Sequence, residues 1–169
     1  MSTLTDTLDA RCTAQALVDT PLGPVRVART ASGLAGLWFE GQKHHPGALQ
    51  APLQPDDPLL REAAAQLQRY FAGDARAFDL PLDLQGTAFQ RTVWQALLRI
   101  PAGRTCSYGE LARAIGRPRA VRAVGAAVGR NPASLVVPCH RVLGQDGGLT
   151  GYAGGVQRKQ SLLQLEACA

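Results

Sequence analysis

The beginning of the chain carries three short apolar runs that are separated by turns rich in glycine and proline. The runs cover Thr13–Thr20, Val25–Arg29 and Leu34–Glu40, and the turns between them are Pro21–Pro24 and Ala31–Gly33. Short apolar runs with tight turns between them are typical of consecutive antiparallel strands. We therefore predict a three-stranded antiparallel meander at the start of the chain.

Apolar residues at helical spacing follow the loop at Gly41–Pro58, which is rich in proline, glycine and glutamine. Asp57 is a good N-cap, Pro58 suits the first helical position, and Gly73 is a stop signal. The apolar residues between them share one face, which we expect to be buried: Leu60, Ala63, Ala64, Leu67 and Phe71. At Leu80–Leu84, leucines alternate with other residues, which indicates a short edge strand or an extended linker.

The second half of the chain has the pattern of several short helices. Thr87–Gln90 and Ser107–Glu110 each have the spacing of a capping box, and Gly116 ends the second of these helices. A further helix is predicted at about Arg119–Val128. Two short helices joined by a tight turn that contains glycine are typical of a helix-turn-helix. The expected buried positions of the three helices are Phe89, Val93, Leu97, Ile100, Leu111, Ala112, Ile115, Val121, Val124 and Val128, with Trp94 beside them.

A branched apolar run at Leu135–Val137 lies between this motif and a closing helix at Gln157–Glu166. The run predicts a buried strand, which Pro138 should end because proline cannot donate to a sheet ladder. Cys139 would then stand at the end of the strand, where side chains become accessible. Because the next two residues are histidine and arginine, we expect the pKa of this thiol to lie below the ~8.5 of a free cysteine.

Composition and charge add a division of the chain into two parts. Of 169 residues, 46% are hydrophobic and 18% are charged, as in globular proteins. No apolar run approaches the ~20 residues of a membrane span, and we see no signal peptide. The net charge of +5 combines seven basic and ten acidic residues in 1–86 with eleven basic and three acidic in 87–169. We therefore place a domain boundary near residues 84–87 and expect the basic second domain to meet a polyanion.

The helix after Gly116 combines arginines with small side chains. Arg119, Arg122 and Ala126 share one face, Arg130 lies just beyond it, and Gly125 keeps the same face low. Small residues let a helix backbone approach a groove closely, while arginines reach phosphates or enter the duplex. This pattern favours DNA as the partner over an ordinary solvated basic face.

Four motifs of the second half resemble those of the O6-alkylguanine-DNA alkyltransferases. The likeness extends over residues 86–166, and its motifs are Arg122–Gly125, Asn131–Pro132, Pro138–Val142 and Gly151–Gly155. The resemblance implies an α+β protein with two domains. The first, residues 1–86, would be a small ribonuclease H-like domain, an antiparallel meander plus a helix, with a structural role. The second, residues 87–169, would be mostly helical and carry a winged helix-turn-helix-like motif that binds double-stranded DNA.

The resemblance also implies a chemistry, without a cofactor. Cys139 would take a methyl or other alkyl group from O6-alkylguanine, and from O4-alkylthymine, in DNA. Water does not hydrolyse the resulting thioether under mild conditions, so the protein would be a methylated-DNA–protein-cysteine methyltransferase with a single turnover. The base must first be flipped out of the duplex, and the family residue that matches Arg122 fills the vacated space. Tyr108 would protonate guanine N3, and the pocket would be formed by Tyr108, Val142, Tyr152 and Ala153.

His140 would take the proton of Cys139 through a water molecule, and Glu166 would orient His140. The sequence supports the role of Glu166 independently. The helix dipole disfavours an acid in a last turn by ~0.3–1 kcal/mol, and the other acids of the second half serve a capping box and a turn. We also include Asn131 in the site. Ala153 departs from the best-known eukaryotic members, which have serine there, so that only its backbone N–H can serve the O6 oxygen.

Two other functions remain open: a DNA-lesion binder that does no chemistry, and a transcriptional regulator with a helix-turn-helix. A cysteine protease would need a remote histidine and an oxyanion hole. We expect no metal, because His44 and His45 are adjacent loop residues without a paired cysteine motif and match no zinc ligand set. The four scattered cysteines indicate free thiols in the cytoplasm. We expect a monomer that does not bind membranes.

Overall fold

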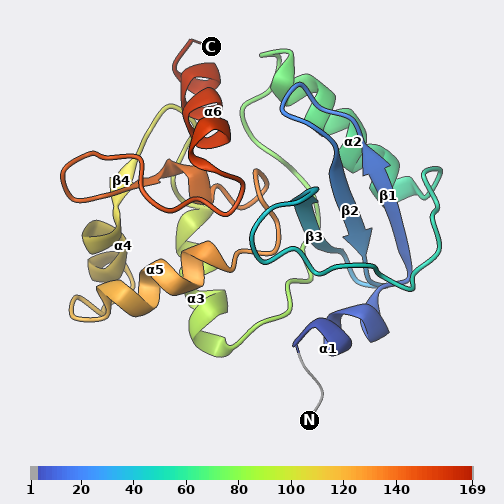
Figure 1. Ribbon diagram of the computed structural model, residues 1–169, viewed down its shortest axis with the longest axis horizontal. Helices are drawn as coiled ribbons and strands as arrows, with labels where there is room; N and C mark the ends of the chain where they lie inside the picture. Colours follow the sequence, from blue (N-terminus) through green and yellow to red (C-terminus); the bar gives the residue numbers. More distant parts are fainter. Residues whose placement is uncertain (1–3, 169) are drawn as a thin grey trace.

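The computed structural model describes residues 4–168 and the side chains of residues 6–167. The chain forms two halves that lie side by side (Figure 1), one built on a sheet and one on helices. The sheet consists of β1 (Ala14–Val18), β2 (Val25–Arg29) and β3 (Leu34–Phe39), in the order β1-β2-β3 with antiparallel neighbours. The predicted meander is confirmed.

Helices cover both faces of this sheet: α2 (Pro58–Phe71) lies on one face and α1 (Leu4–Arg11) on the other. Asp57 caps α2 as predicted, because its carboxylate accepts the N–H groups of Leu59 and Leu60 at 3.0 and 3.1 Å. The sequence did not predict α1, whose pattern is largely polar. This helix is held by Leu8, which packs in an apolar cluster with Trp38.

The outer edge of β3 is paired with two distant segments. Near its start, the Leu34 N–H donates to the Pro81 carbonyl at 2.8 Å, so the predicted edge segment at residues 80–84 makes a single bridge to the sheet. Further along, the Ser134 N–H donates to the Leu37 carbonyl at 3.0 Å. The second half is thereby hydrogen-bonded to the sheet of the first, shortly before Cys139 in sequence.

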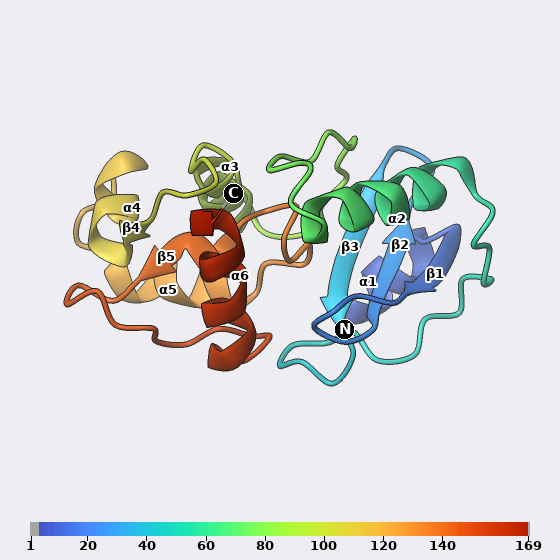
Figure 2. The same ribbon diagram turned by 90° about the horizontal axis from the view of Figure 1, so that it is seen from above.

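The second half consists mainly of α3 (Ala88–Leu97), α4 (Tyr108–Ala114), α5 (Val121–Gly129) and α6 (Val156–Cys168). Figure 2 shows α6 on the side that faces the sheet half. Both predicted capping boxes are formed, and α4 and α5 pack together across the turn at Gly116. Two short parallel strands, β4 (Cys106–Ser107) and β5 (Val142–Leu143), complete this half. None of the helices within residues 4–168 is long and apolar enough to cross a membrane.

The prediction of a strand at Leu135–Val137 is wrong. Leu135 has a φ of 73°, and the Val137 N–H donates to the Ala133 carbonyl at 2.9 Å, so the chain makes a tight turn. The three side chains are buried in a core that is continuous through both halves. A short apolar run alone does not distinguish a strand from a buried turn. Val121, which we expected to be buried, is 39% exposed because α5 begins at this residue.

Candidate active site

Cys139 begins a short 3₁₀ helix, η1 (Cys139–Arg141), directly after Pro138. Its side chain is only 4% exposed, so the expectation of an accessible thiol at the end of a strand is wrong. The cause is the turn at residues 135–137, which carries the chain into the core instead of along a sheet edge. A reacting group must therefore be brought to a buried sulfur.

The prediction that Cys139 has a lowered pKa is also wrong. Burial raises the pKa of the thiol, although a hydrogen bond from Asn131 and the positive charge of Lys159 act in the opposite direction. Arg141, which the sequence placed beside the thiol, turns to Glu166 instead, with Nε 3.0 Å from Oε2. Cys139 is therefore a thiol at neutral pH and requires a base before it can act as a nucleophile.

Asn131 fixes the turn that presents Cys139. Its amide nitrogen donates to the Val137 carbonyl at 2.7 Å, and its Oδ1 accepts the Ala133 N–H at 3.0 Å. Asn131 itself follows the end of α5 and is 4% exposed. One buried side chain thus connects the end of α5 to the backbone just before the thiol.

Glu166 is the centre of a buried hydrogen-bond cluster. Its Oε1 lies 2.7 Å from His140 Nε2, 2.7 Å from Arg141 Nη2 and 2.8 Å from the Tyr70 hydroxyl. Burial alone would raise the pKa of Glu166, but the hydrogen bonds and charges of His140 and Arg141 outweigh it and lower the pKa to about 2. The carboxylate is therefore ionised, and the contact with His140 that we predicted from the sequence is present.

His140 has the tautomer that a base requires. Because the ionised Glu166 can only accept a hydrogen bond, Nε2 must carry the proton and donate to Oε1. Nδ1 therefore keeps its lone pair. Burial lowers the pKa of His140, more than the hydrogen bond to Glu166 raises it, so the ring is neutral. Within residues 6–167, Nδ1 has no hydrogen-bond partner. This nitrogen can therefore accept a proton.

Lys159 belongs to the site, and the sequence analysis missed it. Its side chain is fully buried, and Nζ donates to the carbonyls of Val142 at 2.6 Å and Thr150 at 3.1 Å. Burial lowers the pKa of the amine, while the nearby Cys139 raises it. Its spacing provides a signal, because Lys159 lies seven residues before Glu166 and so on the same face of α6. The ammonium ties the segment just after the thiol to the loop at Thr150.

The residues predicted to form the pocket come from three segments. The Tyr108 hydroxyl lies 3.4 Å from the Thr150 carbonyl and 3.5 Å from that of Gly151, distances that make weak hydrogen bonds. Tyr152 is buried, and Ala153 is held at its carbonyl by the Lys43 N–H at 3.0 Å. Val142 is fully buried in β5. Its carbonyl holds Lys159.

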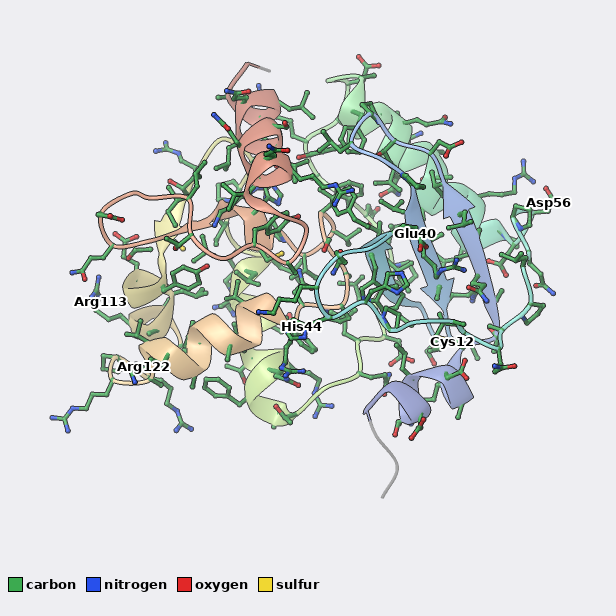
Figure 3. The ribbon with its side chains drawn as sticks, in the orientation of Figure 1. Cys12, Glu40, His44, Asp56, Arg113 and Arg122 are labelled. Atoms are coloured by element: carbon green, nitrogen blue, oxygen red, sulfur yellow. The ribbon has the colours of Figure 1, made fainter. Side chains whose placement is uncertain are left out.

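The residues predicted to bind DNA lie along α5 and at its ends. Arg119, Arg122 and Ala126 are exposed, and Gly125 is half-buried beside the ring of Tyr108. Figure 3 shows Arg122 at the edge of the molecule that is remote from the sheet. The face is therefore low and basic, as its sequence predicts, and it adjoins Tyr108 through Gly125.

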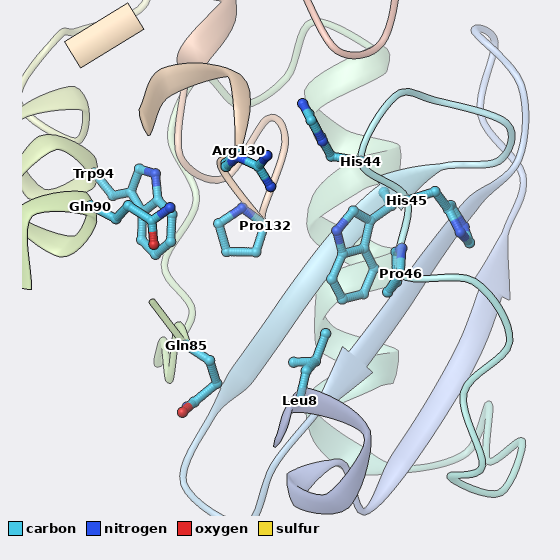
Figure 4. A pocket seen from close by; sticks show the side chains of 10 residues that line it. Leu8, His44, His45, Pro46, Gln85, Gln90, Trp94, Arg130 and Pro132 are labelled. Atoms are coloured by element: carbon cyan, nitrogen blue, oxygen red, sulfur yellow. The ribbon is translucent and has the colours of Figure 1, made fainter. Parts of the chain in front are cut away.

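Arg130 lies apart from the other arginines, beyond the opposite end of α5. It lines a groove of about 300 Å³ between the two halves, together with Trp38, His44 and Trp94 (Figure 4). This groove does not include Cys139. His45 lies 3.5 Å from Glu40, and within residues 6–167 no group of three or more His, Cys, Asp or Glu side chains is placed to hold a metal ion.

Sequence comparison covers nearly all of the chain. Residues 14–84 match the ribonuclease-like domain of 6-O-methylguanine DNA methyltransferase, and residues 88–168 match its DNA binding domain. The methylated-DNA–protein-cysteine methyltransferase of Mycobacterium tuberculosis H37Rv is 50% identical over 149 residues, 88% of this chain and 89% of the relative. The chain belongs to the 6-O-methylguanine DNA methyltransferase family.

Further members of the 6-O-methylguanine DNA methyltransferase family support the assignment. The Methanosarcina barkeri methylated-DNA–protein-cysteine methyltransferase is 47% identical over 151 residues, 89% of this chain and 94% of that protein. The crystal structure of Mycobacterium tuberculosis OGT in complex with DNA superposes with a TM-score of 0.83 at 46% identity, covering 92% and 93% of the two chains. The α+β fold that the sequence predicts is therefore confirmed.

Proposed function

We propose that this protein repairs double-stranded DNA by transferring the alkyl group of O6-alkylguanine, and of O4-alkylthymine, to Cys139. The observation that carries the proposal is the buried thiol beside a neutral histidine that Glu166 holds at 2.7 Å. This arrangement supplies a nucleophile and a base in a site from which water is largely excluded. Membership of the family favours this chemistry over lesion binding alone or transcriptional regulation.

The reaction begins with removal of the thiol proton by His140 Nδ1 through one water molecule, because Nδ1 has no direct hydrogen-bond partner within residues 6–167. The sulfur then attacks the alkyl carbon, and the carbon–O6 bond breaks with its electron pair remaining on guanine. Tyr108 gives a proton to the guanine anion. The proton that His140 took from Cys139 then passes to the Tyr108 phenolate, so that both side chains return to their neutral forms. The thioether that forms is stable to water, so each molecule acts once.

A base inside a duplex must leave the stack to reach a sulfur that is 4% exposed. The α5 face approaches a groove of the DNA through Gly125 and Ala126, while Arg119 and Arg130 neutralise DNA phosphates. Arg122 occupies the space that the base leaves. The flipped base is enclosed by Tyr108, Tyr152, the backbone of Ala153 and the region of Val142.

We assign these tasks to residues 87–169 and a supporting role to residues 1–86. The protein acts as a monomer in the cytoplasm, in keeping with its unpaired cysteines at Cys12, Cys106 and Cys139. The proposed transfer uses protein groups and one water molecule and requires no cofactor.

A duplex oligonucleotide that contains one O6-methylguanine tests the proposal. We expect unmodified guanine to appear in an amount equal to the protein added and then to stop increasing. Cys139→Ser should bind the same duplex but restore no guanine. Binding without any restoration by the unmodified protein would instead identify a lesion-binding protein, and continued turnover would exclude a consumed cysteine.

A further inference from the structure

Tyr70 reaches the candidate active site from the other half of the molecule. It lies in the last turn of α2, and its hydroxyl donates to Glu166 Oε1 at 2.8 Å across 96 positions of sequence. The side chain is 3% exposed. Its ring is held by Phe71, with centroids 5.2 Å apart in an edge-to-face contact, and by Phe78 at 5.3 Å.

We propose that Tyr70 is a positioning residue for the alkyl transfer. Through its hydrogen bond to Glu166, it sets how strongly Glu166 binds the proton of His140, the base of the reaction. The inference rests on the proposed function, because it concerns the same histidine. It assigns to the sheet half of the molecule a part in the chemistry, beyond the structural role that its domain type implies.

Three donors share a single oxygen of Glu166. Oε1 of Glu166 accepts from His140, Arg141 and Tyr70, whereas Oε2 accepts only from Arg141 among the hydrogen bonds within residues 6–167. Each donor withdraws negative charge from the oxygen that faces the imidazole. A carboxylate that loses one donor attracts the remaining protons more strongly. The Tyr70 hydroxyl therefore weakens the hold of Glu166 on the His140 proton.

The other charged groups around His140 cannot replace Tyr70 in this role. Arg141 binds both oxygens of Glu166 through its charged guanidinium. Lys159 acts on His140 by its charge alone and lowers the pKa of the ring. Cys139 is the group that gives its proton to His140 and is itself a neutral thiol before the reaction. Among the described residues, Tyr70 is thus the neutral donor to Oε1 other than His140 itself, and its removal changes the basicity of Glu166 without removing a charge.

A simpler explanation is that Glu166 only satisfies a buried phenol, as buried tyrosines require. The two explanations differ in the pH dependence of the reaction. Loss of packing would lower the rate by the same factor at every pH. Loss of the hydrogen bond should make His140 more basic, so that it remains protonated, and unable to act as a base, up to a higher pH.

The test is the single-turnover rate on O6-methylguanine duplex for Tyr70→Phe, measured across about pH 5 to 9. We expect the midpoint of the acidic limb to rise by about half a pH unit or more, with a rate at high pH close to that of the unmodified protein. Phe78→Leu is the matched control, because it removes an aromatic contact with Tyr70 but keeps the hydroxyl. It should leave the midpoint in place. In a Glu166→Gln background, Tyr70→Phe should no longer shift the midpoint.

A uniform loss of rate, or an equal shift in Phe78→Leu, would overturn the proposal. NMR titration of the His140 imidazole in both variants gives the same comparison without any reaction. It therefore remains decisive if the unmodified protein restores no guanine and the proposed function fails. Should Tyr70→Phe not fold, the Tyr70 Cζ shift of the unmodified chain must follow the His140 titration. A constant shift would contradict the coupling.

Discussion

The thiol of Cys139 and the carboxyl of Glu166 respond in opposite ways to the same burial. Cys139 has few partners for its anion, so burial raises its pKa, whereas hydrogen bonds from His140 and Arg141 outweigh burial at Glu166. The negative charge of the resting site therefore lies on the carboxylate, next to the guanidinium of Arg141. The thiolate has to be generated during the reaction.

This difference predicts how Cys139 reacts with a small alkylating reagent. Because its pKa is raised, the thiolate fraction at pH 7 is smaller than that of a free cysteine, and reactivity should increase through a midpoint above the ordinary ~8.5. Peptide mass spectrometry after timed exposure to iodoacetamide at several pH values measures this midpoint. Cys12, whose pKa burial raises to about 11, is an internal comparison. A midpoint for Cys139 below that of free cysteine would contradict the account.

Among the contacts between individual side chains of the site, one was predicted from the sequence and others were missed. The His140–Glu166 pair could be predicted because an acid in the last turn of a helix is out of place unless it has a partner. The turn of Arg141 towards Glu166 and the approach of Tyr70 could not, since both depend on how α6 and α2 meet in space. Adjacency in sequence suggested that Arg141 acts on the thiol, but η1 directs its side chain elsewhere.

Among the elements, α5 joins the proposed DNA-binding face to the candidate active site. Its exposed face carries Arg122 beside small residues, and Asn131 follows its end and holds the turn before Cys139. Capping signals and helical periods predicted α3, α4 and α5, because these depend on neighbouring residues. The strand expected at residues 135–137 is absent because Asn131 holds this segment in a turn, and a short apolar run does not distinguish a turn from a strand.

We predict that Arg122→Ala slows repair in duplex DNA by roughly ten- to a hundred-fold, since unstacking a base costs a few kcal/mol and Arg122 would no longer offset it. Reaction with free O6-benzylguanine, which requires no unstacking, should be nearly unchanged. Single-turnover rates on the two substrates provide the comparison. Arg61→Ala, an exposed arginine of α2, controls for the loss of charge. Equal losses on both substrates would show that Arg122 serves the fold or the chemistry.

Across the whole molecule, the two halves are joined at the loop Gly151–Gly155, which belongs to the proposed pocket, as well as at Glu166. Arg158 of α6 donates to the Leu22 carbonyl at 2.9 Å and to the Gly154 carbonyl at 3.0 Å, and its guanidinium lies 4.6 Å from the ring centroid of Phe39. The charge change near residues 84–87 indicated two parts, but it could not predict these contacts. The sheet half therefore holds the pocket loop in place.

Arg158→Gln should loosen that loop. We expect a loss of about 2 kcal/mol in the free energy of unfolding, from two hydrogen bonds of a charged donor and one cation–π contact. The reaction should slow alike on duplex DNA and on free O6-benzylguanine, because the pocket itself is affected. Chemical denaturation and single-turnover rates measure both effects, with Arg61→Gln as the control. A selective loss on duplex DNA would place Arg158 in DNA binding instead.

Cys139 is proposed to be the single, irreversible alkyl acceptor of the protein. The most direct test is the intact mass of the protein after incubation with excess O6-methylguanine duplex, followed by peptide mapping. We predict a gain equal to one methyl group in place of one hydrogen, located on the peptide that contains Cys139 and unchanged by prolonged incubation. Label on Cys12, Cys106 or Cys168, more than one methyl group per chain, or an unmodified protein after guanine has been restored would contradict the account.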